Sequence, residues 1–255
     1  MIKVGVFFGG KSIEREVSFN SGRTVCDHLD NHLYKIIPIF QHQTGQLYIL
    51  PWSFLHRGKI ADFAHRLDTQ ATKIYWDDLP KLIDFAYIAL HGKYAEDGKM
   101  QAILELFQIP YLGTKIFGSS LGINKIIQNR FLQMHNIMTP KGFGLSIKEV
   151  LTATNEMILA KMKTANINFP LIVKPQAEGS SIGIYVIKNT KNLITLLHKS
   201  CFSTSKIGQD IMIEEKIIGM EFNQILITDP STQEMIALPP TEIILKPGCD
   251  IFDYH

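Results

Sequence analysis

Short apolar runs alternate with amphipathic segments along the first half of the chain. Helical spacing occurs at residues 12–29, with Ser12 as the expected N-cap, and again at residues 99–107. Residues 41–82 carry mixed short patterns, from which no helix or strand can be assigned. The order strand, helix, strand, strand, helix predicts a doubly wound, mostly parallel α/β sheet. Three apolar runs have the composition of its buried strands: residues 2–8, 34–40 and 85–90.

The pattern changes after a Gly/Ser-rich stretch at residues 113–122, which we interpret as a domain boundary. The expected helices beyond it are residues 123–135, 147–165 and 193–199. The expected strands are residues 171–174, 182–187, 211–215, 221–228 and 234–238. These elements predict a second folded region.

Composition and charge narrow the class of protein. Lys and Arg number 26 against 24 Asp and Glu, and this balance gives no electrostatic case for nucleic acid or a membrane as partner. Cys26, Cys201 and Cys249 lie far apart without a CxxC pair, which indicates neither a disulfide framework nor a zinc site. Without an apolar run long enough for a signal or membrane segment, we expect a cytoplasmic protein.

Residues 5–12 match the P-loop pattern GxxxxGK[ST] literally. That motif needs a complete strand before its first glycine, but Gly5 falls inside the first apolar run. A P-loop NTPase therefore remains an alternative that requires Lys11 to touch phosphate. The favoured interpretation is a Gly-Gly turn at the carboxyl end of the first strand, the edge where open α/β sheets bind ligands.

Polar side chains follow the first and third strands at this edge. Glu14 and Ser18 come after the Gly-Gly turn, and His91, Glu96 and Asp97 come after the third strand. This group could receive an ammonium or steer a carboxylate. Alternatively, Glu96 and Asp97 only cap the next helix, and the two interpretations are compatible.

A second group lies in the later strands. Lys174 ends an apolar strand, where an unpaired charge is costly unless it meets an anion, and the Gly/Ser loop at 178–181 offers backbone amides for a phosphate. Glu214 lies at the end of another apolar strand, and Glu221 follows that strand. They could accept hydrogen bonds from an adenine amino group and from ribose hydroxyls, or could simply be solvated.

Taken in this order, the segments resemble D-alanine–D-alanine ligases of the ATP-grasp superfamily, over nearly the whole chain except residues 41–82. The resemblance implies that ATP phosphorylates the carboxylate of one D-alanine, and that the amino group of a second attacks the acyl phosphate to give a dipeptide for peptidoglycan synthesis. The segments that carry it are GGKSIEREVSFNSG, ALHGKYAEDG, IPYLGT, FPLIVKPQAEGSSIGI, IMIEEKIIGMEF, ALPPTEI and the terminal FDY.

The resemblance also implies a domain organisation. Residues 1–122 would be the α/β substrate-binding domain, 123–216 a central ATP-grasp α+β subdomain, and 217–255 the start of an incomplete C-terminal subdomain. A homodimer is the implied assembly.

The resemblance assigns two sets of site residues. Glu14 would hold the ammonium of the first D-alanine, and Ser180 would bridge toward it, which makes these two the candidate catalytic residues. The implied substrate-binding residues are Glu14, Ser18, His91 and Glu96. The implied ATP-binding residues are Lys125, Lys174, Ser180, Ser181, Glu214, Glu215, Lys216, Ile217 and Glu221.

Within the ATP set, Lys125, Lys174 and the amides around Ser181 would contact phosphates. The adenine would lie against Glu214 and the three residues after it, and the ribose against Glu221. Lys125 follows Asn124, where the family usually has Asp, and Ala95 replaces a usual glycine.

The chain ends before the parts that bind magnesium or manganese in the family, so its expected metal ligands lie beyond residue 255. We interpret it as a truncated ligase whose last strands expose apolar faces and which, alone, has little or no activity. A non-catalytic binding remnant of the family is the alternative. The spacing of Glu221 and Asn223 suits a metal site, but their context fits the ribose segment. The choice among D-alanine, D-lactate and D-serine as second substrate is not assigned.

Overall fold

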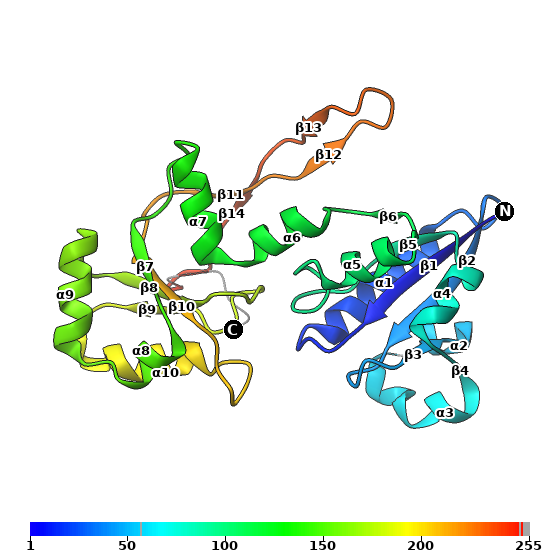
Figure 1. Cartoon of the computed structure of the whole chain (residues 1–255), viewed down its shortest axis with the longest axis horizontal. Coiled ribbons are helices and arrows are strands. Elements are labelled where there is room, and N and C mark those ends of the chain that lie inside the picture. Colours follow the sequence, from blue (N-terminus) through cyan, green and yellow to red (C-terminus); the bar gives the residue numbers. More distant parts are fainter. Residues whose placement is uncertain (57, 250, 252–255) are drawn as a thin grey trace. The chain divides into compact units, whose positions relative to one another are not determined.

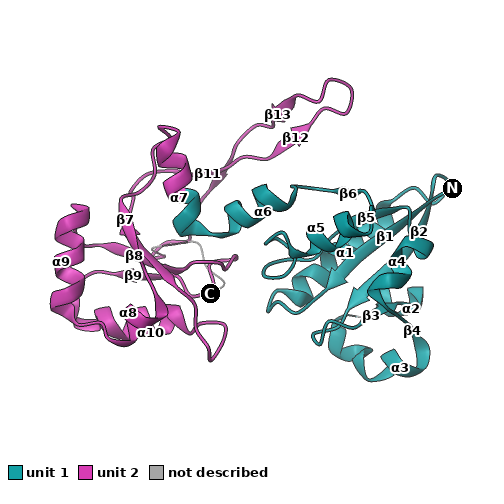
Figure 2. Ribbon diagram, viewed as in Figure 1, with its two compact units in different colours: residues 1–128 teal, residues 129–255 magenta. Residues whose placement is uncertain are grey.

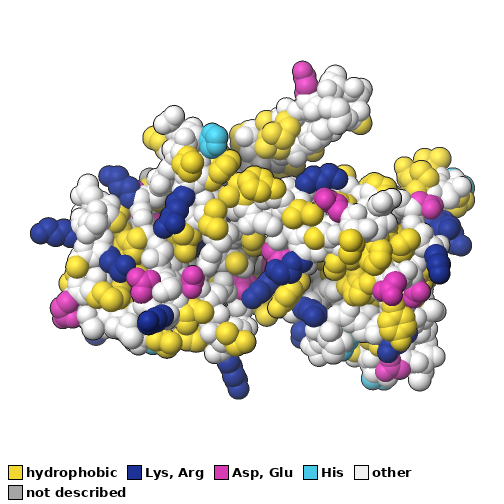
Figure 3. All heavy atoms as spheres, in the orientation of Figure 1, with side chains coloured by type: hydrophobic (Ala, Val, Ile, Leu, Met, Phe, Trp, Pro, Cys, Tyr) yellow, Lys and Arg dark blue, Asp and Glu magenta, His cyan; other side chains and the backbone are white. Residues whose placement is uncertain are grey.

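The computed structural model describes residues 1–56, 58–249 and 251. The chain forms two compact units, residues 1–128 and 129–255 (Figure 2). Figure 1 labels their helices and strands. No helix within these described ranges combines the length and the hydropathy needed to cross a membrane. On the face drawn in Figure 3, basic and acidic side chains are interspersed.

The first unit is built on a six-stranded sheet with the strand order β4-β3-β2-β1-β5-β6. Its strands are β1 (Ile2–Gly9), β2 (Tyr34–Gln41), β3 (Leu47–Ile49), β4 (Thr72–Ile74), β5 (Phe85–Ile88) and β6 (Tyr111–Leu112). Its α-helices are α1 (Arg15–His28), α2 (Trp52–Leu55), α3 (Leu67–Gln70), α4 (Leu79–Leu82), α5 (Lys99–Leu106) and α6 (Ile116–Ile123). The next helix, α7 (Lys125–Met134), crosses the division between the units.

The predicted doubly wound sheet is confirmed. Strand β1 runs parallel to both β2 and β5, and β5 runs parallel to β6. The unassigned residues 41–82 add β3, which is antiparallel to β2, and β4, which is antiparallel to β3 and forms the edge of the sheet. Because the chain goes from β1 to β2 on one side and later to β5 on the other, β1 lies at the topological switch point, where such sheets open a crevice.

Both faces of this sheet are buried, as the alternation along β1 shows. Phe8 packs with Phe19 of α1 on one face, in the same hydrophobic cluster as Phe40 of β2. Phe7 points to the opposite face, where its cluster includes Met100 and Leu104 of α5. Successive residues of a strand face opposite sides, so helices cover the sheet on both.

Helix α1 approaches β1 very closely at Gly22. A Cβ atom built there would lie 2.4 Å from the Cβ of Phe8, far inside normal contact distance. Glycine at this position therefore allows the helix to lie against the strand, which fixes the height of the helix over the carboxyl edge of the sheet.

The second unit contains a four-stranded antiparallel sheet in the order β7-β10-β8-β9. Its strands are β7 (Gly142–Leu145), β8 (Leu171–Pro175), β9 (Tyr185–Ile187) and β10 (Ile211–Glu215). The accompanying helices are α8 (Ile147–Leu151), α9 (Asn155–Ala165) and α10 (Leu193–Cys201). Two short antiparallel ladders follow, formed by β11 (Glu221–Asn223) with β14 (Thr241–Ile243) and β12 (Leu226–Thr228) with β13 (Met235–Ala237).

Two of the expected helices differ from the structure. The single helix expected at 147–165 is divided, because Thr154 accepts the N–H of Met157 and starts α9 separately. The Gly/Ser-rich stretch at residues 113–122 contains most of helix α6, and the domain boundary expected there stays a prediction. Helix α1 begins at Arg15 with Glu14 as its N-cap, while Ser12 accepts the N–H of Glu14.

The last strands expose their apolar side chains, as expected. The exposed apolar side chains of this region are those of Ile217, Ile218, Met220, Phe222, Ile225, Leu226, Ile227, Met235, Ile236 and Ile244. The terminal segment 252–254, on which part of the family resemblance rests, lies outside the described residues.

The contact between α1 and β1 predicts that Gly22→Ala destabilises the protein. The added methyl group overpacks a rigid core contact, which costs roughly 1–3 kcal/mol and outweighs a helix-propensity gain of about 1 kcal/mol. Urea unfolding followed by circular dichroism measures the change.

Gly122→Ala is the matched control, because Gly122 is an exposed helical glycine whose Cβ would meet nothing within 4 Å. It should be neutral or stabilising. Equal midpoints for Gly22→Ala and the wild-type protein would contradict the close-packing argument.

Candidate functional site

In the first unit, the carboxyl ends of β1 and β5 are tied together by Ser18. Its hydroxyl accepts the N–H of Gly9 at 2.9 Å and donates to the carbonyl of Ala89 at 2.9 Å. Ser18 is fully buried, so this predicted site residue acts here as a connection between two strand ends. Gly9 and Gly10 both have positive φ, as the predicted turn requires.

Glu14 lies at this edge, nearly buried at the start of α1. A Cβ built on Gly92 would lie only 2.3 Å from Oε2 of Glu14 and 2.5 Å from Oγ of Ser12. The carboxylate therefore lies against the backbone that follows β5. Glu14 stands at the N-cap of α1, where the helix dipole favours a negatively charged group.

His91 and Glu96 form a pair beside Glu14. Nδ1 of His91 lies 3.7 Å from Oε1 of Glu96, and Nε2 lies 2.9 Å from the hydroxyl of Ser21. The other carboxylate oxygen of Glu96 accepts the N–H of Gly92. The interaction with the Glu96 carboxylate raises the pKa of His91, against the opposing effect of burial, and the same interaction lowers the pKa of Glu96.

The P-loop alternative lacks its structural context. Gly5 lies within β1, whose register with β2 continues to Gly9, so no phosphate-wrapping loop begins there. Lys11 instead extends toward Gly45 and lies 5.5 Å from the centroid of the Tyr94 ring.

In the second unit, strand register separates a core face from a polar face. Val173 pairs with Ile213, and both point into the hydrophobic cluster. Residues one position along point the opposite way, and these include Lys174 on β8 and Glu214 on β10. The sheet thus presents two ionisable side chains on the face opposite the core.

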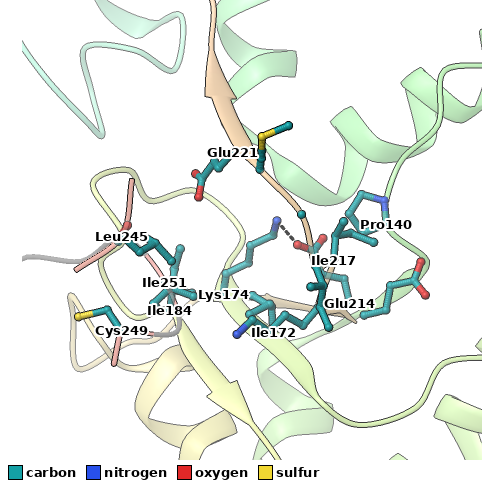
Figure 4. Close-up of a pocket in the computed structure, with 16 residues that line it drawn as sticks. Pro140, Ile172, Lys174, Ile184, Glu214, Ile217, Glu221, Leu245, Cys249 and Ile251 are labelled. Atoms are coloured by element: carbon teal, nitrogen blue, oxygen red, sulfur yellow. Dashed lines mark hydrogen bonds and ion pairs between the residues drawn. The ribbon is translucent and has the colours of Figure 1, made fainter. Parts of the chain in front are cut away.

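This face forms one wall of a cavity of about 670 Å³ (Figure 4). Small-molecule sites typically span about 300–1,000 Å³. Seven of the predicted ATP-binding residues line it: Lys174, Ser181, Glu214, Glu215, Lys216, Ile217 and Glu221. Its apolar lining includes Pro140, Ile172, Ile184, Leu245 and Ile251.

Lys174 and Glu214 form an ion pair inside this cavity, with Nζ 2.5 Å from Oε1. The side chains are 20% and 7% exposed, so both charges are largely removed from water. Oε2 of Glu214 is buried and makes no hydrogen bond within the described part of the chain. A buried carboxylate oxygen without a donor costs free energy, which a ligand that supplies an N–H would recover.

The Gly/Ser loop between β8 and β9 has a fixed base. Glu178 is buried and accepts hydrogen bonds from Thr204 and Gln209, both at 2.8 Å. Ser180 and Ser181 have positive φ angles of 50° and 56°. Such backbone turns direct amide groups toward one side, an arrangement that suits an anion.

Two predicted ATP-binding residues lie elsewhere. Lys125 starts α7 in the first unit, and Ser180 occupies the exposed side of its loop, so neither lines the cavity. Their roles stay predictions. Sequence reasoning missed Ser21, although its spacing of three residues from Ser18 places both on one helix face, and it missed the anchoring role of Glu178.

The comparisons with known proteins agree with this geometry. The sequence model of the D-ala D-ala ligase N-terminus matches residues 3–114, and that of the D-ala D-ala ligase C-terminus matches residues 131–255. The D-alanine--D-alanine ligase of Natranaerobius thermophilus is 30% identical over 265 residues, covering 100% of this chain and 69% of the relative. That of Chlorobaculum parvum is 32% identical over 267 residues, covering 99% and 70%.

Solved structures give the same result. The VanG D-Ala:D-Ser ligase from Enterococcus faecalis superposes with a TM-score of 0.81 at 25% identity, covering 100% of this chain and 72% of that one. The D-alanine--D-alanine ligase from Bacillus anthracis, solved in complex with ATP, gives 0.67 at 28% identity, with 97% and 67% covered. A mostly parallel sheet unit followed by an antiparallel unit with a polar pocket is the architecture of an ATP-grasp enzyme. The chain belongs to the D-alanine–D-alanine ligase family.

The His91–Glu96 pair predicts that Glu96→Gln lowers the pKa of His91, because the main cause of its elevation is lost. An NMR titration of the imidazole protons measures this, with Glu234→Gln, a residue of the second unit, as the control. An unchanged His91 titration would contradict the assignment.

The shifted pKa values of His91 and Glu96 also make the stability of the folded protein depend on pH. The raised His91 pKa contributes stability that is fully present below its unfolded value of 6.5 and is lost as pH rises through the folded value. The lowered Glu96 pKa contributes stability above its unfolded value of 4.5, lost as pH falls through the folded value.

Proposed function

We propose that the protein is an ATP-dependent ligase that joins two D-alanines through an acyl phosphate. The single observation that carries the proposal is the cavity of the second unit, in which Glu214 presents a buried oxygen without a donor beside Lys174. Membership of the ligase family supports the same reaction.

The cavity chemistry suits a purine nucleotide with an exocyclic amino group. Apolar side chains such as Ile172 and Ile184 offer surfaces for the faces of a flat base. Oε2 of Glu214 would accept a hydrogen bond from the adenine amino group. The ammonium group of Lys174 would move from Oε1 of Glu214 to a phosphate of the nucleotide. The carboxylate of Glu221 would accept hydrogen bonds from the ribose hydroxyls.

The Gly/Ser loop would complete the phosphate site. The amides around Ser181 would lie against the phosphate oxygens and exclude water from them. Protection from water matters because an acyl phosphate hydrolyses readily. The anchor at Glu178 would let the tip of the loop adjust while its base stays fixed.

The first unit offers the amino-acid chemistry. Glu14, supported by His91 and Glu96, would hold the ammonium of the first D-alanine. The carboxylate of that D-alanine would take the γ-phosphoryl group of ATP. The amino group of the second D-alanine then attacks the carbonyl carbon, a C–N bond forms, phosphate leaves, and the amine proton passes to solvent. ADP and the dipeptide are the other products.

The described residues bring together no cluster of three or more His, Cys, Asp or Glu side chains that could hold a metal ion. We therefore assign no step to magnesium. The role of magnesium with ATP stays a proposal. The homodimer and the division of the chain at residues 122 and 216 also stay proposals.

Calorimetric titration with ATP, D-alanine and L-alanine tests the function. We expect Lys174→Ala to weaken ATP binding about ten- to hundredfold, because a charge-assisted hydrogen bond contributes roughly 1.5–3 kcal/mol. Lys191→Ala, an exposed lysine of the same unit, and Lys11→Ala should leave ATP affinity unchanged. Absence of ATP binding, or no preference for D-alanine over L-alanine, would reject the proposal.

Base selectivity is a separate consequence of Glu214. A carboxylate accepts from the adenine amino group but repels the carbonyl oxygen that guanine presents at the same position. Glu214→Gln should therefore reduce the preference for ATP over GTP about tenfold, since an amide can donate as well as accept. Competition binding with both nucleotides measures it, and an unaltered preference would exclude Glu214 from base recognition.

A further inference from the structure

One cysteine differs from the other two in its surroundings. Cys26 and Cys201 are buried, whereas Cys249 is exposed. Burial raises the pKa of the Cys26 thiol to about 12 and also raises that of Cys201. Since the thiolate is the reactive form, these two thiols are inert in the folded protein.

Cys249 lines the cavity that contains Lys174 and Glu214. Figure 4 places it beside Leu245, Ile184 and Ile251, the apolar part of the lining. The donorless oxygen of Glu214, a residue only 5% exposed, is an independent sign that this cavity takes a ligand. A group attached to the sulfur of Cys249 would occupy the space that the ligand needs.

We propose that Cys249 is a thiol modification site, at which mixed-disulfide formation with a low-molecular-weight disulfide blocks the nucleotide pocket. The inference rests on the proposed function of that pocket. Glutathione disulfide is a suitable reagent of this class, because its carboxylates complement the ammonium groups of Lys174 and Lys216, which line the same cavity.

The reaction is a balanced thiol–disulfide exchange. Cys249 loses its proton to solvent, and its sulfur attacks one sulfur of the disulfide. The original S–S bond breaks, a new S–S bond to Cys249 forms, and one glutathione leaves as a thiolate that takes up a proton. The cysteine sulfur is oxidised and the departing sulfur is reduced, so a thiol reductant reverses the step.

The test treats the folded 255-residue chain with glutathione disulfide, with and without saturating ATP, and maps the adducts by peptide mass spectrometry. We expect one glutathione per chain, on Cys249, formed at least tenfold more slowly when ATP is present. Calorimetry of the adduct should show ATP binding at least tenfold weaker, and dithiothreitol should restore it.

Cys249→Ser provides the control. The ATP affinity of this variant is measured before and after treatment with glutathione disulfide, and the two values should be equal. Circular dichroism of the adduct excludes unfolding as the cause. Labelling of Cys26 or Cys201 in place of Cys249, or an adduct that binds ATP normally, would overturn this inference but not the proposed function. Failure of the untreated chain to bind ATP would instead reject the proposed function, and with it this competition, even if Cys249 were labelled.

Discussion

The antiparallel register between β8 and β10 is the constraint on which the second unit depends. It places Val173 and Ile213 in the core and, on the opposite face, Lys174 and Glu214 within reach of each other. A slip of one residue in either strand would turn the charge of that strand into the hydrophobic cluster and expose its apolar side chains. A single register therefore sets both the stability of the unit and the polarity of its cavity.

An ion pair this far from water gains little net stability, because desolvation of the two charges offsets their attraction. Replacing Lys174 and Glu214 with apolar residues would leave the core intact but remove two charges from this wall of the cavity. The pair is better understood as keeping two opposite charges balanced until a ligand arrives. In the first unit, Ser18 has a different function, since it links two strand ends and carries the helix that presents Glu14.

Strong local patterns explain what the sequence could predict. The buried runs of β1, β5, β8 and β10 are continuous and end at polar or glycine residues, so these strands could be predicted from the chain alone. The sequence did not predict β3, β4, β6 and β7, which complete the two sheets. Residues 41–82 could not be assigned from the sequence because their short elements depend on packing against distant parts of the chain. An example is the contact of Phe63 with Phe19 of α1, whose ring centroids lie 5.3 Å apart. The pairing of Lys174 with Glu214, 40 residues apart, depends on a register that no local pattern contains.

The strands from β11 to β14 display their apolar side chains to solvent instead of packing them into either core. They are short and form only two-stranded ladders, which leave unpaired backbone groups along their edges. Surfaces of this kind adhere to one another, and attraction between copies grows with the number of copies in solution. Protein concentration, more than temperature, should therefore govern how long preparations of this chain remain clear.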